Sequence, residues 1–312
     1  MKEKLNHRLA RVTLRQLRAL QAVLRTGTTK GAAEALHVTP PAITLQLREL
    51  EGLVGVPLLE RRPDGVQPTA AGAEIQEAAT RIETLLADTA DMIETLRGLE
   101  GGKVAVGVIS TAKYFAPMAI AAFAREHPEI DLSLKIGNRE ETIRSLQGYE
   151  FDFAIMGRPP SGFAVDAAPI GDHPHVIIAP PHHALAGSRH LALQDLVGET
   201  FLLREPGSGT RSVLEELFAA EPAALASGME IGSNETIKQA VIAGLGIALI
   251  SAHTVAAELA EGRLILLDVE GLPVVRTWYL VKRADKRLLP AADAMWRFLS
   301  AQARAFLPPM AG

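Results

Sequence analysis

The chain has 312 residues, a formal net charge of −4 and no cysteine. Its length predicts two or three domains, and the lack of cysteine excludes disulfides, thiolate catalysis and cysteine-ligated metal sites. Hydrophobic residues make up 48% of the chain, but no run approaches the roughly 18 uncharged apolar residues of a membrane span. The charged N-terminus also lacks the apolar stretch of a secretory signal, so we expect a cytoplasmic protein without membrane contact.

The charge is unevenly distributed along the chain. Residues 1–70 carry 11 Lys/Arg and 6 Asp/Glu, a balance of +5, whereas the remaining residues carry 21 and 30, a balance of −9. A basic end on an acidic body is typical of a DNA-binding segment, because contacts to phosphates supply most of the non-specific affinity. A solvated basic face is the alternative.

The first part of the chain predicts a short arm and a helix. Residues 1–12 are interpreted as a mobile basic arm. The stretch Thr13 to Gln16 has the pattern of a capping box that opens a helix. The apolar positions of this helix should face inward, and they are Leu14, Leu17, Leu20 and Leu24.

Two short helices with a tight connection are predicted next. Thr28 or Thr29 can cap the first helix, which buries Ala32, Ala33 and Leu36. Thr39 can cap the second helix, with Pro40 at its first position, where no N–H is needed. Residues that recur at helical spacing should face inward in the second helix, namely Ile43, Leu47, Leu50 and Val54. The opposite side carries Pro41, Thr44, Leu45 and Arg48.

This pair of helices is typical of a helix-turn-helix whose second helix reads DNA; an ordinary helical hairpin is the alternative. The sequel favours the first interpretation. Residues 55–59 predict a strand and residues 61–65 a basic turn, which together would form a wing. Arg61 and Arg62 could then reach phosphates or the minor groove.

A long helix is predicted from Thr69 to Leu96. Apolar residues form a stripe along it, broken by Thr89, and they are Ile75, Ala78, Ile82, Leu85, Met92 and Leu96. Such a stripe predicts pairing with a second copy of the chain, and packing on the chain's own C-terminal domain is the alternative. A flexible hinge is expected at residues 98–103.

Strand-like and helix-like segments alternate beyond Lys103, which predicts an α/β domain with mostly parallel sheets. Strands are expected at residues 104–109, 130–136, 151–156, 176–179, 200–203, 247–250 and 275–282. Helices are expected at residues 112–127, 139–147, 192–197, 211–220 and 234–243, and a last amphipathic helix should bury Met295, Phe298 and Leu299.

Ligands of open α/β sheets bind beyond the carboxyl ends of strands, near helix N-termini. Three stretches of the sequence fit that position, although each could be an ordinary helix cap. They contain Ser110 and Thr111; Ser208, Thr210 and Arg211; and Asn234, Glu235 and Thr236. Together with Arg158 and Arg204 they predict a site for a small anionic ligand.

The N-terminal motifs resemble the winged helix-turn-helix of LysR-type transcriptional regulators. The resemblance covers the paired alanines, the stretch from Thr39 to Glu51, the stretch from Val54 to Arg61 and the PTAAG sequence that ends at Gly72. The family usually has Gln at the position of Pro40, Ser at that of Thr44, and Phe at those of Leu59 and Thr29. The Pro40 departure puts direct base readout at that position in doubt. The resemblance implies contacts to DNA from Thr28, Thr39, Pro41, Thr44, Leu45, Arg48, Arg61 and Arg62.

The resemblance also implies the architecture and the partners. The fold would be a winged helix-turn-helix (residues 1–68), a linker and dimerisation helix (69–98) and a two-lobed effector domain like a periplasmic binding protein (99–312). Lobe I would comprise about residues 103–173 and 276–312, and lobe II about 174–275. The expected partners are double-stranded promoter DNA, a small anionic metabolite, a second copy of the chain in a dimer or a tetramer of two dimers, and RNA polymerase.

Longer phrases are similar to the CbbR subgroup, which controls Calvin-cycle (RuBisCO) operons. These phrases are VTLRQLRALQAV, FLLREPGSGTR and GSNETIKQAVIAGLGIALIS. The subgroup senses phosphorylated sugars, related organic phosphates or NADPH, which implies an effector of that kind and no cofactor. A LysR-type sensor of an unphosphorylated carboxylate could use the same side chains, so that alternative stays open.

Other functions have weaker support in the sequence. His173, His175, His182 and His183 cluster, but their spacing is irregular for a metal site, and none is expected. The GSGT sequence lacks the Lys-Ser/Thr of a Walker A loop. No serine, base and acid follow one another in a hydrolase order, so we expect no enzyme, and a solute-binding α/β protein is the remaining alternative.

Overall fold

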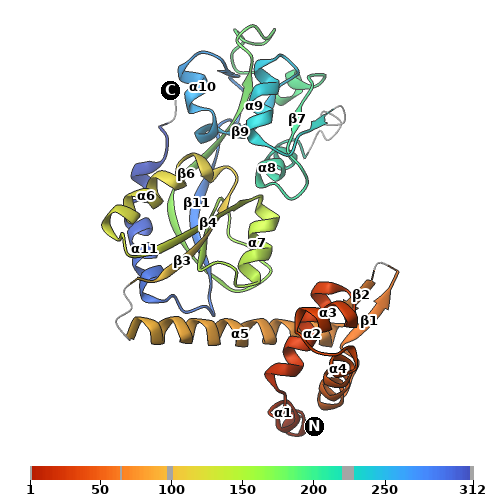
Figure 1. Cartoon of the computed structure of the whole chain (residues 1–312). Helices are drawn as coiled ribbons and strands as arrows, with labels where there is room; N and C mark the ends of the chain where they lie inside the picture. The colour runs from red at the N-terminus through yellow and green to blue at the C-terminus, as the bar shows by residue number, and fades with distance from the viewer. Residues whose placement is uncertain (1, 64, 97–100, 220–227, 310–312) are drawn as a thin grey trace. The chain divides into compact units, whose positions relative to one another are not determined.

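The computed structural model describes residues 2–63, 65–96, 101–219 and 228–309. The chain forms two compact units, Met1–Ile93 and Glu94–Gly312 (Figure 1). No helix in the described ranges is long and apolar enough to cross a membrane.

The N-terminal unit is a helical bundle with a two-stranded wing. Its elements are α1 (Lys2–Leu9), α2 (Leu14–Thr26), α3 (Thr29–Ala35), α4 (Pro40–Val54), β1 (Leu59–Arg62), β2 (Gly65–Pro68) and α5 (Ala70–Leu96). The predicted capping box at Thr13 and Gln16 is present. Leu20, Ile43 and Leu50 lie in one buried cluster together with Ala32 and Ala33, so the predicted inward faces of α2, α3 and α4 pack on one another. Leu14 is the exception: it was expected to face inward, but it is the first residue of α2 and is 38% exposed.

Two predictions for this unit were wrong. The expected N-terminal arm is helix α1, and Arg8 of this helix donates to the carbonyl of Gly52 at the end of α4. The first wing strand runs from Leu59 to Arg62, not over residues 55–59. Gly55 has a φ of 93° and ends α4, so the chain is still leaving the helix where the strand was expected.

The long helix α5 covers 27 residues, which corresponds to roughly 40 Å at 1.5 Å per residue. Ala79 is fully buried against the winged-helix core, and Ala71 and Ile75 pack beside it. Further along, Ile82, Leu85, Leu86 and Ile93 are exposed large hydrophobic residues, and Leu85 is 67% exposed. The predicted hinge that follows falls partly on residues 98–100, outside the described residues.

The C-terminal unit contains two lobes, each with its own hydrophobic core. The first lobe is built from β3 (Lys103–Ile109), η1 (Ala112–Tyr114), α6 (Ala116–Glu126), β4 (Asp131–Gly137), α7 (Arg139–Gln147), β5 (Phe153–Met156), α11 (Pro290–Gln302) and η5 (Ala303–Phe306). Strand β3 pairs in parallel with β4 and β5. The C-terminal helix α11 buries Met295 and Leu299 in this core, and Phe298 is only partly buried there.

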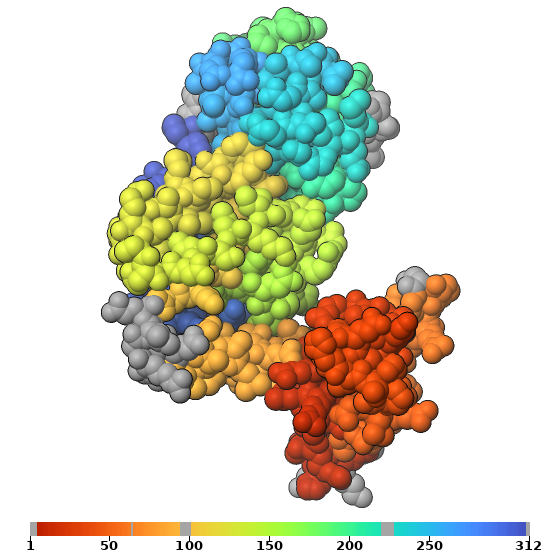
Figure 2. Space-filling model, in the orientation of Figure 1, coloured from red at the N-terminus to blue at the C-terminus, as the bar shows by residue number. Residues whose placement is uncertain are grey.

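The second lobe contains η2 (Leu193–Leu196), β7 (Leu202–Leu203), α8 (Gly209–Leu217), β8 (Met229–Glu230), α9 (Asn234–Ile242), β9 (Ala248–Ser251), η4 (Ala252–Thr254), α10 (Ala256–Ala260) and β10 (Ile265–Leu266). Its core is formed around Phe201, Ile237 and Ile250. Side chains of the two lobes meet along the face shown in the space-filling view (Figure 2).

Two long strands, β6 (Val165–Ala179) and β11 (Val274–Arg283), connect the lobes. They are antiparallel to each other, with His173 opposite Arg276, and β11 is also antiparallel to β5. The expectation of mostly parallel sheets was therefore wrong: the seven-stranded sheet is mixed, because the two connecting strands run against their neighbours.

Smaller corrections concern individual elements. The helix expected over 112–127 is a 3₁₀ turn followed by α6, and the one over 192–197 is the short 3₁₀ helix η2. Strand β6 begins at Val165, 11 residues before the predicted strand, although it contains Pro169 and Pro174. Strands β8 and β10 and helix α10 are short elements that the sequence did not predict.

Candidate DNA-binding face and effector pocket

Helix α4 presents the predicted DNA-facing residues on the side away from its buried stripe. Ile43, Leu47 and Leu50 are buried, whereas Leu45 is 54% exposed and Pro41 and Arg48 are also exposed. Helical periodicity separates the two sets. The exposed set combines an apolar contact surface with a guanidinium, which suits methyl groups and base edges in a major groove.

Three of the predicted DNA-facing residues are threonines at or near the N-termini of α3 and α4. Thr28 caps α3, and its hydroxyl accepts a hydrogen bond from the Gly31 N–H at 3.0 Å. Thr44 donates to the Pro40 carbonyl at 3.1 Å. Thr39 precedes α4 without a side-chain capping bond, which leaves its exposed hydroxyl available to a phosphate or base.

The wing carries two arginines on strand β1 rather than in the turn. Arg61 is exposed. Arg62 is paired with Glu60 of the same strand, 2.6 Å away. The carboxylate of Glu60 therefore offsets the charge of Arg62.

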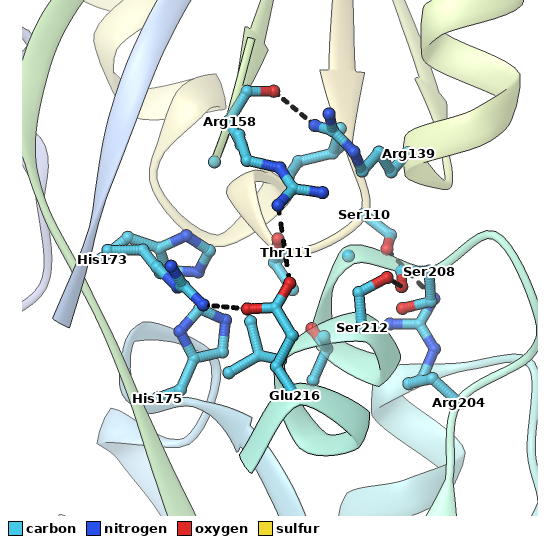
Figure 3. A pocket seen from close by; sticks show the side chains of 16 residues that line it. Ser110, Thr111, Arg139, Arg158, His173, His175, Arg204, Ser208, Ser212 and Glu216 are labelled. Atoms are coloured by element: carbon cyan, nitrogen blue, oxygen red, sulfur yellow. Dashed lines mark hydrogen bonds and ion pairs between the residues drawn. The ribbon is translucent and has the colours of Figure 1, made fainter. Parts of the chain in front are cut away.

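A pocket lies between the two lobes of the C-terminal unit (Figure 3). It is formed where β3 and β5 end, where α7 and α8 begin, and where β6 and β11 cross between the lobes. Its lining includes six of the ten predicted effector residues, which are Ser110, Thr111, Arg158, Arg204, Ser208 and Thr210. Parallel strands and following helices therefore bring these side chains together, as the general rule for α/β sheets predicts.

Arg204 is the most heavily bonded side chain of the pocket and is only 3% exposed. Its guanidinium donates to both carboxylate oxygens of Glu205, at 2.7 and 2.8 Å, and also to the side chain of Asn234. One of its nitrogens additionally donates to the Ser110 hydroxyl across the pocket at 3.3 Å. Arg204 thus holds an element of each lobe and fixes the position of Ser110.

The opposite wall carries three further arginines and one carboxylate. Glu216 of α8 lies between Arg158, 3.5 Å away, and Arg276 of β11, to which it is also paired (Figure 3). Arg139 donates to the carbonyls of Arg158 and Pro159. Burial, and secondarily the charge of Arg158, lowers the pKa of Arg139. The lining contains four arginines and one carboxylate, and Glu205 beside it neutralises Arg204, so four positive and two negative charges leave a balance of +2, which favours an anionic ligand.

The remaining four predicted effector residues lie outside the pocket lining. Arg211 points to Glu215 and Glu230, at 2.8 and 3.1 Å. Asn234 acts through Arg204. Glu235 accepts a hydrogen bond from the hydroxyl of Tyr114 at 2.6 Å and so links the lobes, and the Thr236 N–H bonds to the Ser233 hydroxyl that caps α9.

Sequence reasoning missed six polar lining residues, which are Arg139, His173, His175, Ser212, Glu216 and Arg276. Arg139 follows strand β4 and could have been found by the rule used for Ser110, that ligands bind beyond the carboxyl ends of strands. His173, His175 and Arg276 come from the crossing strands, whose pairing the sequence did not reveal. Within the described residues no cluster of histidines and carboxylates has the arrangement of a metal site.

A winged helix-turn-helix joined to a two-lobed domain with a pocket between the lobes defines a ligand-responsive DNA-binding regulator. The chain belongs to the LysR family of bacterial transcriptional regulators: residues 14–73 match the family's helix-turn-helix domain and residues 97–304 match the LysR substrate binding domain. Members of this family are regulators, not enzymes.

Two relatives show which regulators of the family this chain resembles in sequence. The chain is 52% identical over 302 residues to the regulator CbbR of Xanthobacter flavus, which covers 96% of this chain and 91% of the relative. It is 49% identical over 298 residues to CbbR of Rhizobium meliloti (strain 1021), with 95% of each chain covered.

Solved structures agree with the fold. The regulatory domain of Synechocystis PCC6803 CcmR in complex with 2-PG is 36% identical, with a TM-score of 0.63, and covers 66% of this chain and 98% of that one. Full-length CbnR complexed with its target DNA is 23% identical, with a TM-score of 0.61, and covers 93% of this chain and 99% of that one.

Proposed function

We propose that this protein regulates transcription of carbon-fixation genes, the RuBisCO operon above all, in response to a small phosphorylated metabolite bound between its two lobes. Near-full-length similarity to CbbR regulators supports the target genes. The observation that carries the effector class is the pocket lining, which holds four arginines and several hydroxyl groups against two carboxylates, Glu216 in the lining and Glu205 beside Arg204. An unphosphorylated carboxylate would use fewer of these donors.

The effector class can be tested by a thermal-shift screen of the purified full-length chain. The compounds would be ribulose bisphosphate, phosphoglycolate, phosphoenolpyruvate and NADPH, each beside a matched unphosphorylated compound. We expect stabilisation only by phosphorylated compounds, since a ligand that binds the folded state alone raises its stability. Stabilisation by plain carboxylates only would leave a LysR-type regulator but overturn the phosphorylated effector.

A matched pair of variants locates the binding site in that screen. Arg276→Gln removes a pocket guanidinium, and we expect it to reduce the shift. Arg189→Gln removes an arginine that is 84% exposed and paired only loosely with Asp268, at 3.9 Å, and it should leave the shift unchanged. Equal shifts in both variants would place the effector elsewhere.

The DNA-reading role of α4 predicts a cost for Arg48→Ala. If Arg48 contacts a base edge, the variant should bind the operator about 1–3 kcal/mol more weakly and discriminate less at one base position. Quantitative footprinting at fixed salt measures both quantities. Arg125→Ala, which removes an exposed arginine of α6, serves as the control. An unchanged footprint and affinity in Arg48→Ala would exclude Arg48 from the DNA contact.

We further propose that α5 pairs with α5 of a second copy, because Ile82, Leu85, Leu86 and Ile93 leave an apolar surface exposed. Leu85→Glu should convert the dimer to monomers, since a charge would be buried in the helix pair. Light scattering measures the mass. Ala87→Glu places the same charge about 200° around the helix and should leave the dimer intact. An unchanged mass in Leu85→Glu would refute this pairing surface.

A further inference from the structure

Two buried imidazoles form the part of the pocket wall where β6 crosses between the lobes. His173 and His175 are 3% and 2% exposed, and both line the pocket (Figure 3). The His173 ring is stacked on the Trp278 ring, with centroids 3.7 Å apart and planes at 18°. The centroid of the His175 ring lies 4.2 Å from that of the His173 ring. The rings are therefore held in fixed positions.

These imidazoles have unused hydrogen-bonding capacity. Within the described residues, both ring nitrogens of His173 are buried without a hydrogen-bond partner, and so is Nδ1 of His175, although the His175 ring also lies near the backbone of His173 and Val274, which act on its pKa through hydrogen bonds. The third histidine of the same aromatic stack differs, because His253 Nδ1 accepts a hydrogen bond from the Trp278 indole at 3.1 Å. Buried polar atoms of folded proteins are nearly always paired. His173 is thus the member of the stack with both ring nitrogens unpaired, and His175 has one such nitrogen.

Gly157 packs beside one of these nitrogens. This glycine follows β5 and lines the pocket, and a Cβ at this position would come within 2.8 Å of His173 Nδ1. A side chain there would cover the nitrogen. The lack of a side chain at Gly157 therefore keeps the His173 ring on the pocket lining without a Cβ pressed against it.

The imidazoles present a donor and an acceptor rather than a charge. Burial lowers the pKa of His173 well below its ordinary value and lowers that of His175 to about 4. Each ring is therefore neutral at pH 7, with one N–H donor and one bare nitrogen acceptor. A carboxylate accepts only and would leave the bare nitrogen unpaired, whereas a hydroxyl both donates and accepts.

We propose that His173 and His175 form a hydroxyl-binding subsite, so that the effector carries an anionic group at the arginines and a hydroxyl group at the imidazoles. This inference rests on the proposed anion site between the lobes and specifies its ligand as a phosphorylated hydroxy compound. The two histidines select among anions that the arginines alone would accept equally.

The test compares binding of glycerol phosphate, propyl phosphate and phosphoglycolate to the full-length chain by calorimetry. All three probes carry a phosphate. Glycerol phosphate also carries hydroxyl groups, phosphoglycolate carries a carboxylate, and propyl phosphate carries neither. We expect glycerol phosphate to bind about tenfold or more tightly than propyl phosphate, because buried groups that await a hydroxyl are left unpaired by its absence. The affinity for phosphoglycolate should not exceed the affinity for propyl phosphate by a similar factor.

The His173→Phe variant keeps a flat ring for stacking on Trp278 and removes both nitrogens. We expect this variant to lose the preference for glycerol phosphate and to bind propyl phosphate within about twofold of wild type. Its melting temperature should be no lower than that of wild type, because replacing an unpaired polar group with an apolar one of similar shape removes a desolvation cost. A merely structural role for His173 would leave the preference intact. Gly157→Ala places a methyl group within 2.8 Å of His173 Nδ1 and should reduce the preference in the same direction.

The other outcomes overturn either the subsite or the site as a whole. Equal binding of glycerol and propyl phosphates to wild type, or a preference that persists in His173→Phe, would refute the hydroxyl subsite and leave the anion site standing. Tightest binding of phosphoglycolate with uptake of a proton would replace it with an imidazolium–carboxylate contact. No binding of any phosphate probe would overturn the proposed effector site together with this inference.

Discussion

Gly72→Ala is expected to destabilise the N-terminal unit by about 3 kcal/mol, near the upper end of overpacking costs. A Cβ at this position would lie 1.9 Å from the Leu58 carbonyl oxygen and 3.2 Å from Pro68 Cβ. The nearest atom is backbone and cannot rotate away. Helix α5 would have to separate from the wing, so operator binding should fall together with stability.

The surrounding bonds explain why the structure cannot easily make room. Leu58 is fully buried, its N–H donates to Glu51 at 2.8 Å, and its carbonyl accepts from the Thr69 N–H at 3.0 Å. The Thr69 hydroxyl in turn donates to Pro57 and accepts from the Gly72 N–H. Any shift of α5 breaks several of these bonds at once.

Urea unfolding of the full-length chain, followed beside operator affinity, measures the effect. Gly52→Ala is the matched control, because nothing lies within 4 Å of a Cβ at that position of α4, and alanine should stabilise the helix by up to about 1 kcal/mol. Equal midpoints for Gly72→Ala and wild type would contradict the close approach of α5 to Leu58.

The winged-helix unit was largely predictable because its signals are local. Capping residues and apolar spacing of three and four define α2, α3 and α4, and each depends on neighbours within one or two helical turns. The error at the first wing strand arose at Gly55, which was expected to open the strand. Its left-handed φ of 93° instead ends helix α4, and the strand begins only at Leu59. The charged stretch of α1 carries too few apolar residues to predict a helix.

The pocket was predictable where it depends on the ends of parallel strands and not where it depends on the crossing strands. Ser110 and Arg158 follow β3 and β5 directly, so the general position of ligands in α/β sheets finds them. Arg276 and His173 are about 100 residues apart in the sequence. They lie opposite each other only because β6 and β11 pair in an antiparallel register. Pro169, Gly171 and Pro174 made β6 look interrupted, since proline and glycine usually end a strand.

Arg204→Met should abolish the effector response and destabilise the C-terminal unit by about 3 kcal/mol. Removing one partner of a buried ion pair costs roughly 3–5 kcal/mol, because the other charge remains buried. Here the side chain of Glu205 keeps 21% exposure, which places the cost at the lower end. The response is lost because Ser110 and Asn234 also lose the guanidinium that joins them.

A double variant separates stability from signalling. Arg204→Met with Glu205→Gln removes the unpaired charge, so urea unfolding should recover most of the lost stability. The response of operator binding to the effector should stay absent, because the contact between Arg204 and Ser110 links the two lobes at the pocket. A stable double variant that still responds to the effector would mean that Arg204 only fixes the fold of the second lobe, and that closure of the pocket depends on Arg158, Arg276 and Glu216 instead.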